Sequence, residues 1–167
     1  LVGTEESSIG PRMIVIASTA AKEGKSISAY NIAISSARAG RRTLLVEADL
    51  RSGSKAEVLG LSVEPQSVLE PLRYYSGQVG NSLQMGSQVE NLYVCPSPGP
   101  QRQPAAIIES SEMQRFLKDA RSRFDMVILD TPSLTRCDDA LLLEDQTDGI
   151  VLVSRPGFTD IGVLEAA

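Results

Sequence analysis

The chain has 167 residues, of which 42% are hydrophobic and 22% are charged, which is typical of one soluble globular domain with a sizeable core. Its net charge of -5 and isoelectric point near 4.8 argue against a nucleic-acid-binding protein, which needs a basic face. The absence of histidine excludes a Ser-His-Asp triad and a His/Cys zinc site, and the two cysteines, Cys95 and Cys137, are expected to be reduced.

Five apolar runs predict strands that are buried on both faces. They cover residues 13–18, 43–49, 91–97, 125–131 and 149–154. Because these runs are apolar at nearly every position, helices are expected to cover both sides of the sheet, as in a parallel sheet.

Helical patterns separate these runs. Residues 26–40 place apolar side chains, including Ile27, near one face and close on Gly40, and residues 110–124 begin with a serine cap. Shorter helices are expected at residues 105–109 and 138–145 and from residue 159, and loops with short helices at 52–90. The alternation predicts an α/β, doubly wound fold: a mostly parallel sheet flanked by helices in three layers, as in P-loop NTPases and Rossmann-like proteins.

A Gly-Lys-Ser tripeptide lies between the first strand and the first helix. Gly24 permits close approach of the backbone, and the loop N–H groups with the helix N-terminus are expected to hold phosphates. Lys25 is expected to reach the β- and γ-phosphates, and the Ser26 hydroxyl to coordinate Mg²⁺. Thr19 stands where the usual GxxxxGK[ST] loop begins with glycine.

Carboxylates follow two other predicted strands. Glu47 and Asp49 are two residues apart, so alternation along an extended chain points both to the same side, although a solvated acidic turn would look similar. Asp130 ends an apolar run in the manner of a Walker B aspartate, which holds Mg²⁺ directly or through water. Since ligands collect at the carboxyl ends of strands in open α/β sheets, the three clusters together predict a magnesium-nucleotide site.

These motifs resemble those of the bacterial tyrosine kinases (BY-kinases), which are related to the MinD/ParA P-loop ATPases and linked to the polysaccharide co-polymerases of capsule and exopolysaccharide export. The Walker A loop ends in Gly-Lys-Ser, the Walker A′ motif reads "LLVEADLR" at residues 44–51, and the Walker B motif reads "VILDTP" at residues 127–132. Arg51, at the end of the A′ motif, separates this family from general partitioning ATPases. The resemblance covers roughly residues 12–165.

The resemblance implies a protein-tyrosine kinase domain that uses ATP and Mg²⁺, autophosphorylates, and regulates the chain length and export of exopolysaccharide or capsule. Its catalytic residues would be Lys25, Glu47 and Asp49, with Glu47 orienting or deprotonating the acceptor hydroxyl. Its metal ligands would be Ser26, Asp49 and Asp130. Its nucleotide-binding residues would be Ala21, Lys22, Glu23, Gly24, Lys25, Ser26, Ile27 and Arg155.

The resemblance also implies partners and a location. A homo-oligomer is expected, with a membrane polysaccharide co-polymerase segment in the same polypeptide or as a separate adaptor, and no nucleic acid. The domain would be cytoplasmic and tethered to the membrane through regions outside this sequence. Because the sequence starts at Leu1 and its last helix runs to the end, we expect residues 1–167 to be a single P-loop domain within a longer polypeptide, without the family's C-terminal helix and tyrosine-rich tail.

The departures from the family pattern leave other functions open. Ala21 and Lys22 replace the Pro-Gly of the family loop SxxPGEGKS, and Glu47 replaces the first aspartate of the A′ motif. These changes favour an alternative, a nucleotide-gated scaffold of the export machinery without catalysis. A MinD/ParA-like ATPase switch is the third possibility. Two residues argue against it: Arg51, and Ala20, which stands at the position of the MinD signature lysine.

The four tyrosines are candidates for modification. Tyr30 and Tyr93 lie in a predicted helix and a predicted strand, so we expect them to pack rather than to accept phosphate. The pair Tyr74-Tyr75 falls in the predicted loop region and reads as an ordinary surface pair.

Overall fold

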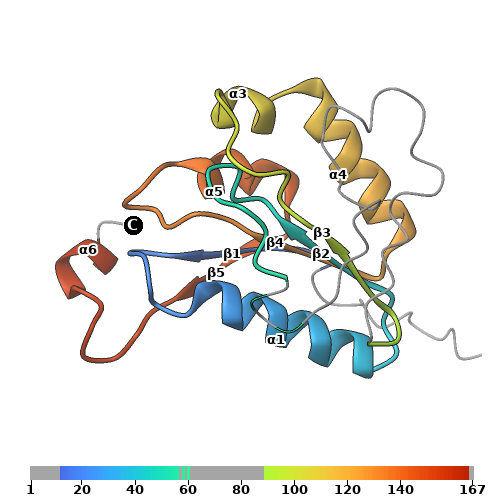
Figure 1. Ribbon diagram of the computed structural model, residues 1–167, viewed down its shortest axis with the longest axis horizontal. Coiled ribbons are helices and arrows are strands. Elements are labelled where there is room, and N and C mark those ends of the chain that lie inside the picture. The colour runs from blue at the N-terminus through green and yellow to red at the C-terminus, as the bar shows by residue number, and fades with distance from the viewer. Residues whose placement is uncertain (1–11, 57, 59, 61–88, 166–167) are drawn as a thin grey trace, which may run out of the picture.

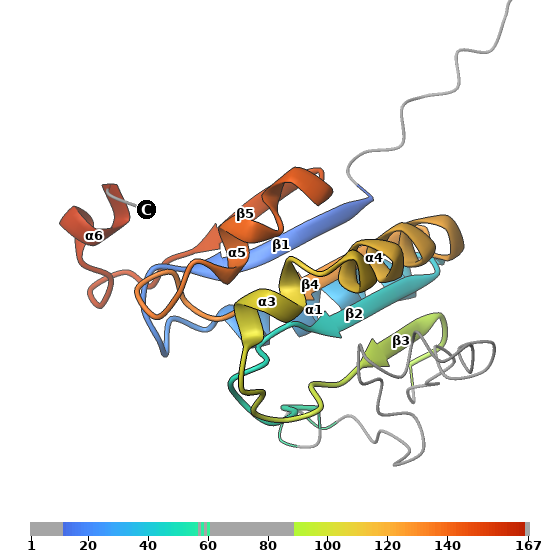
Figure 2. The ribbon, with the colours of Figure 1, turned by 90° about the horizontal axis from the view of Figure 1, so that it is seen from above.

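The computed structural model describes residues 12–56, 58, 60 and 89–165. Within them, five parallel strands form one sheet in the order β3-β2-β4-β1-β5 (Figure 1; Figure 2). The strands are β1 (Met13–Ser18), β2 (Thr43–Glu47), β3 (Leu92–Cys95), β4 (Met126–Asp130) and β5 (Gly149–Val153). The helices are α1 (Lys25–Arg38), α3 (Pro104–Ile108), α4 (Ser111–Arg123), α5 (Asp139–Leu142), the 3₁₀ helix η2 (Glu144–Gln146) and α6 (Ile161–Glu165).

Helices cover both faces of the sheet, with α1 on one face and α3, α4 and α5 on the other (Figure 1). The side chains of β1 alternate between these layers: Ile14 and Ile16 pack with α1, and Met13 and Val15 pack with α4. Burial on both sides explains why the strands read as continuous apolar runs. The predicted α/β fold with a parallel sheet between two helical layers is confirmed.

The central strand β4 lies between β1 and β2. Its last residue, Asp130, is level with Ile16 of β1 and with Glu47 of β2. The connection from β1 through α1 to β2 therefore passes over β4. As a result, the carboxyl ends of β1, β4 and β2 lie side by side at one edge of the sheet.

Two details differ from the sequence-based expectation. β5 is an edge strand in the described sheet and pairs with β1 alone, so Val151 and Leu152 remain 40% and 38% exposed. The helix expected at 138–145 is divided into α5 and η2. Most of the predicted loop region at 52–90, including Tyr74 and Tyr75, lies outside the described residues. None of the described helices is long and apolar enough to cross a membrane.

Candidate functional site

The loop between β1 and α1 uses two residues in the left-handed backbone region. Gly24, the N-cap of α1, has φ 91°, and a Cβ built there would meet nothing within 4 Å. Conformation, and not crowding, therefore favours glycine at this position. Lys22 has φ 69°, so it keeps a glycine-like conformation where the family loop has glycine.

The buried carboxylate of Glu23 stabilises this loop through hydrogen bonds. Its carboxylate accepts hydrogen bonds from the Thr19 hydroxyl at 2.9 and 3.0 Å, from Ala20 N at 2.8 Å, and from the hydroxyl of Thr159, beyond β5. Burial by itself raises the pKa of Glu23, but the hydrogen bonds from Thr159, Ala20 and Thr19 outweigh burial and hold the pKa below its ordinary value. Thr19, at the position of the usual first glycine, is thus a buried partner of Glu23.

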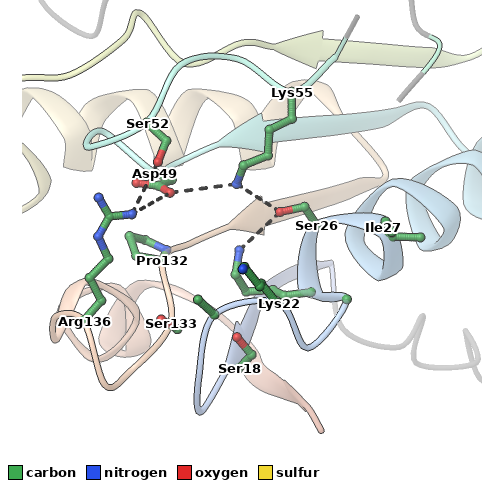
Figure 3. A pocket seen from close by; sticks show the side chains of 13 residues that line it. Ser18, Lys22, Ser26, Ile27, Asp49, Ser52, Lys55, Pro132, Ser133 and Arg136 are labelled. Carbon is green, nitrogen blue, oxygen red and sulfur yellow. Dashed lines mark hydrogen bonds and ion pairs between the residues drawn. The ribbon is translucent and has the colours of Figure 1, made fainter. Parts of the chain in front are cut away.

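A cavity of about 380 Å³ opens beside the loop (Figure 3). Its walls come from three segments that follow β1, β2 and β4: Ser18, Ala21, Lys22, Gly24, Lys25, Ser26, Ile27; Asp49, Ser52, Lys55; Pro132, Ser133 and Arg136. Four of these side chains are basic, against one acidic side chain. This excess of positive charge suits a polyanionic ligand such as a chain of phosphates.

Lys25 and Asp130, predicted from separate motifs, are in direct contact. Lys25 Nζ lies 2.5 Å from Asp130 Oδ1 and 3.4 Å from Ser26 Oγ. Burial lowers the pKa of Lys25, and the negative charge of Asp130 opposes that shift. The ion pair therefore joins the ends of the Walker A and Walker B motifs, as the strand order allows.

Two further basic residues reach the same carboxylates, and neither belongs to a recognised motif. Lys55 Nζ donates a hydrogen bond to Ser26 Oγ at 3.0 Å and lies 3.8 Å from Asp49 Oδ2 (Figure 3). It also lies 3.5 Å from Asp130 Oδ2. Arg136 Nη1 lies 3.7 Å from Asp49 Oδ2. Each lies in a loop a few residues after a strand-end motif. Because these loops have no regular pattern, the sequence alone could not predict that Lys55 and Arg136 belong to the site.

The oxygens brought together suit Mg²⁺. Ser26, Asp49 and Asp130 offer a hydroxyl and two carboxylates, the hard ligands that this ion prefers. Asp130 Oδ2 is buried and accepts no hydrogen bond from any described residue. Within the described ranges, no three His, Cys, Asp or Glu side chains gather into a metal cage. The hydroxyl and the two carboxylates suit Mg²⁺, an ion that usually keeps phosphate oxygens and water as its other ligands.

Glu47 is held differently from Asp49. It is 4% exposed, and its Oε1 accepts from the Tyr30 hydroxyl and from Lys55 N, both at 2.7 Å, while Oε2 accepts from Ser97 N at 2.9 Å. Burial, together with the negative charge of Glu47, raises the pKa of Tyr30. Tyr30 packs in the core, as predicted, whereas Glu47 is not among the residues that line the cavity.

The other predicted site residues divide into two groups. Ile27, expected on the apolar face of its helix, is 56% exposed and lines the cavity with the loop residues. Glu23 and Arg155 do not line it, and the Arg155 guanidinium lies 5.3 Å from the ring centroid of Phe158. A role for these two residues in nucleotide binding stays a prediction. Arg51, the family-distinguishing residue, forms an ion pair with Asp139 at the start of α5.

Comparison with known proteins gives relatives for most of the chain. No protein-family model matches it. It is 30% identical over 147 residues to the tyrosine-protein kinase CpsD of Streptococcus pneumoniae serotype 4, covering 87% of this chain and 63% of CpsD. It is 32% identical over 151 residues to the tyrosine-protein kinase YwqD of Bacillus subtilis, covering 89% of this chain and 62% of YwqD. The chain is related to the bacterial tyrosine kinases.

This relationship extends to a transport protein. The succinoglycan biosynthesis transport protein ExoP of Rhizobium meliloti is 30% identical over 148 residues, which is 89% of this chain but 19% of ExoP. The chain also spans less than two thirds of the length of CpsD and YwqD. The resemblance inferred from the three motifs is confirmed.

Solved structures of other proteins have the same fold. The chimerical protein CapA2B2 matches with a TM-score of 0.82 at 25% identity, over 97% of this chain and 70% of that chain. The VpsO kinase domain matches with a TM-score of 0.84 at 23% identity, over 96% and 78%. MinD of Pyrococcus horikoshii, solved with Mg-ADP, matches with a TM-score of 0.69 at 23% identity, over 92% and 60%. These matches confirm the P-loop NTPase fold.

Proposed function

We propose that this chain is a protein-tyrosine kinase domain that binds ATP with Mg²⁺. One observation carries the proposal: Lys25, Ser26, Asp49 and Asp130 come from three distant segments and meet beside one positively charged cavity. The relationship to CpsD and YwqD, both named tyrosine-protein kinases, supports phosphoryl transfer to tyrosine. MinD, a more distant neighbour solved with Mg-ADP, supports the choice of nucleotide and ion.

In phosphoryl transfer, these residues would mainly position the phosphates and stabilise their negative charge. The N–H groups at the start of α1 would hold phosphate oxygens, and Lys25 would stabilise charge on the transferred phosphoryl group. Ser26, Asp49 and Asp130 would hold Mg²⁺, which neutralises phosphate charge when bound. Lys22 adds positive charge to the same cavity.

Glu47 remains the predicted base for the acceptor hydroxyl. Its two oxygens already accept hydrogen bonds from Tyr30, Lys55 and Ser97. An acceptor hydroxyl therefore has to replace one of these donors, or approach beside them, before a proton passes to Glu47. This arrangement favours the second candidate function, a nucleotide-gated scaffold without kinase activity.

The biological setting is proposed from the relatives. ExoP is named a succinoglycan biosynthesis transport protein, which supports a role in regulating the chain length and export of exopolysaccharide or capsule. We propose that the domain acts as a homo-oligomer on the cytoplasmic side of the membrane. Its partner would be a polysaccharide co-polymerase segment, in the same polypeptide or in a separate adaptor.

Incubation with γ-labelled ATP and Mg²⁺ tests the kinase proposal. A glutamate-tyrosine copolymer serves as an external acceptor, so that the result does not depend on a tail tyrosine. We expect labelled phosphotyrosine with the unmodified protein and a loss of at least about 100-fold with Lys25→Met, because removal of one preorganised charge costs about this much. Lys118→Met, on the exposed side of α4, is the matched control and should retain activity.

The other outcomes separate the candidates. Tight binding of Mg-nucleotide without labelled tyrosine, also in the longest natural form of the polypeptide, would reject the kinase function and favour the scaffold function. Release of inorganic phosphate without labelled tyrosine would favour the MinD/ParA-like switch. Failure of every magnesium nucleotide to bind would overturn all three.

A further inference from the structure

The Lys55 ammonium group lies beside all three predicted metal ligands, and two of them, Ser26 and Asp49, are drawn with it in Figure 3. Its Nζ is 3.0 Å from Ser26 Oγ, 3.5 Å from Asp130 Oδ2 and 3.8 Å from Asp49 Oδ2. These are the oxygens that a divalent cation would use at this site. A metal ion and the Lys55 ammonium would therefore compete for the same position.

The neighbouring cations do not take this position. Lys25 pairs with the other oxygen of Asp130, at 2.5 Å, and Arg136 approaches Asp49 alone, at 3.7 Å. Among the described residues, Lys55 is the basic side chain that has ion pairs with both aspartates. Its positive charge thus compensates two buried carboxylates that would otherwise repel each other.

The backbone at Lys55 is held by hydrogen bonds and packing, whereas the side chain is partly exposed to solvent. Lys55 N donates to Glu47 Oε1 at 2.7 Å, and the next residue, Ala56, is 1% exposed in the core beside α1. Ser97 holds the start of the same segment, because its Oγ donates to Ser52 O at 2.7 Å and lies 3.1 Å from Asp49 O. The Lys55 side chain is 32% exposed, so the ammonium can turn toward solvent without unfolding the segment.

We propose that Lys55 is a built-in counter-cation of this site, and that a divalent cation binds only by displacing the Lys55 ammonium from Ser26, Asp49 and Asp130. The inference rests on the metal-nucleotide site proposed above. It predicts that metal alone binds weakly. A metal-phosphate pair binds better, because its phosphate provides a new partner for the displaced ammonium.

Titration with Mn²⁺ in the absence of nucleotide tests this inference, with free Mn²⁺ measured by electron paramagnetic resonance. Lys55→Gln keeps the backbone hydrogen bond to Glu47 but removes the charge, and we expect it to bind Mn²⁺ about tenfold more tightly than the unmodified protein. Lys55→Met should behave in the same way, and Lys55→Arg should resemble the unmodified protein. Lys22→Gln is the matched control, since Lys22 lines the same cavity without an ion pair to Asp49 or Asp130 within the described structure.

The outcomes separate this inference from the proposed function. Equal Mn²⁺ affinity of Lys55→Gln and the unmodified protein would overturn the displacement, while loss of binding in Asp49→Asn would leave the metal site itself supported. An equal gain in Lys22→Gln would also overturn it, because the effect would then reflect the total charge of the cavity. Absence of Mn²⁺ binding in every variant, even with ADP present, would overturn both proposals.

Discussion

At Lys22 the chain keeps a backbone conformation that a lysine does not favour. Its φ of 69° lies in the left-handed region, where a residue with a Cβ is less stable by about 1–2 kcal/mol. Glycine avoids that cost but loses about 0.5–1 kcal/mol more backbone entropy on folding. The first effect is the larger one, so this position favours glycine.

We therefore predict that Lys22→Gly raises the free energy of unfolding by up to about 1 kcal/mol. Lys22→Ala is the control, because it removes the same charged side chain and keeps the unfavourable backbone. Urea unfolding of both variants measures the difference. A lower urea midpoint for Lys22→Gly than for Lys22→Ala would show that the positive φ carries no cost.

Among the secondary-structure elements, α4 has the clearest local signals. Ser110 Oγ accepts a hydrogen bond from Met113 N at 3.1 Å and donates one to Ile107 O at 2.6 Å, so it caps α4 and ties it to α3. Arg121 and Arg123 lie in the last turn, where positive charge interacts favourably with the helix dipole. The serine cap predicted from the sequence is confirmed.

Removal of this cap should be measurable. We predict that Ser110→Ala lowers the free energy of unfolding by about 1 kcal/mol, because Met113 N loses its partner. Ser111→Ala, at the exposed first position of the helix, should change it by less than about 0.5 kcal/mol. Similar losses for the two variants in thermal or urea unfolding would contradict a specific role for the cap.

In α1, the helical pattern of the sequence does not correctly predict the burial of every side chain. Helical spacing places Ile27 near the apolar face, but Ile27 is 56% exposed beside the cavity. It lies in the first turn of α1, at the edge of the sheet where the strands end. Periodicity indicates the direction of a side chain around the helix; whether a strand lies beneath that turn depends on the sheet.

At the scale of the whole molecule, Glu23 and Asp148 each connect segments that are far apart in the sequence. Glu23 links the loop before α1 to Thr159, and Asp148 accepts hydrogen bonds at 2.8 Å from the backbone N–H groups of Arg12 and Met13. Asp148 also pairs with Arg121 of α4 at 2.9 Å. Burial opposes ionisation in both, but the hydrogen bonds that each accepts, and for Asp148 also the charge of Arg121, hold its pKa below the ordinary value.

These pKa shifts predict a loss of stability in acid. Each carboxyl binds a proton at lower pH in the folded state than in the unfolded state, so the unfolded state takes up protons first as the pH falls. The contribution is complete at neutral pH and is lost below the ordinary values of 4.5 for Glu23 and 3.8 for Asp148. Urea midpoints measured from pH 7 to pH 3 should decrease in this window.

Asp148→Asn provides the control for this pH dependence. The variant should be less stable at pH 7, because the amide attracts Arg121 less strongly, and its urea midpoint should change less below about pH 4. An acid dependence as steep as that of the unmodified protein would show that Asp148 does not contribute to it.

Local patterns in the sequence determined most of the elements and part of the proposed site. Burial on both faces makes each strand a continuous apolar run, and the segments between them have helical periodicity, so the α/β class followed from the sequence. Three strand-end motifs also predicted that Lys25, Ser26, Asp49 and Asp130 lie together, because a parallel sheet presents the carboxyl ends of its strands at one edge.

Strand order and side-chain partners were decided only by the tertiary structure. The pairing of β4 with both β1 and β2 brings Asp130 between the two other motifs, and no local pattern encodes which strands become neighbours. The same packing directs the carboxylate of Glu47 to Tyr30 and the ammonium of Lys55 to Ser26 and the two aspartates. A charged residue in a sequence shows what it can bind, but its partner is the opposite charge or hydrogen-bonding group that folding places beside it.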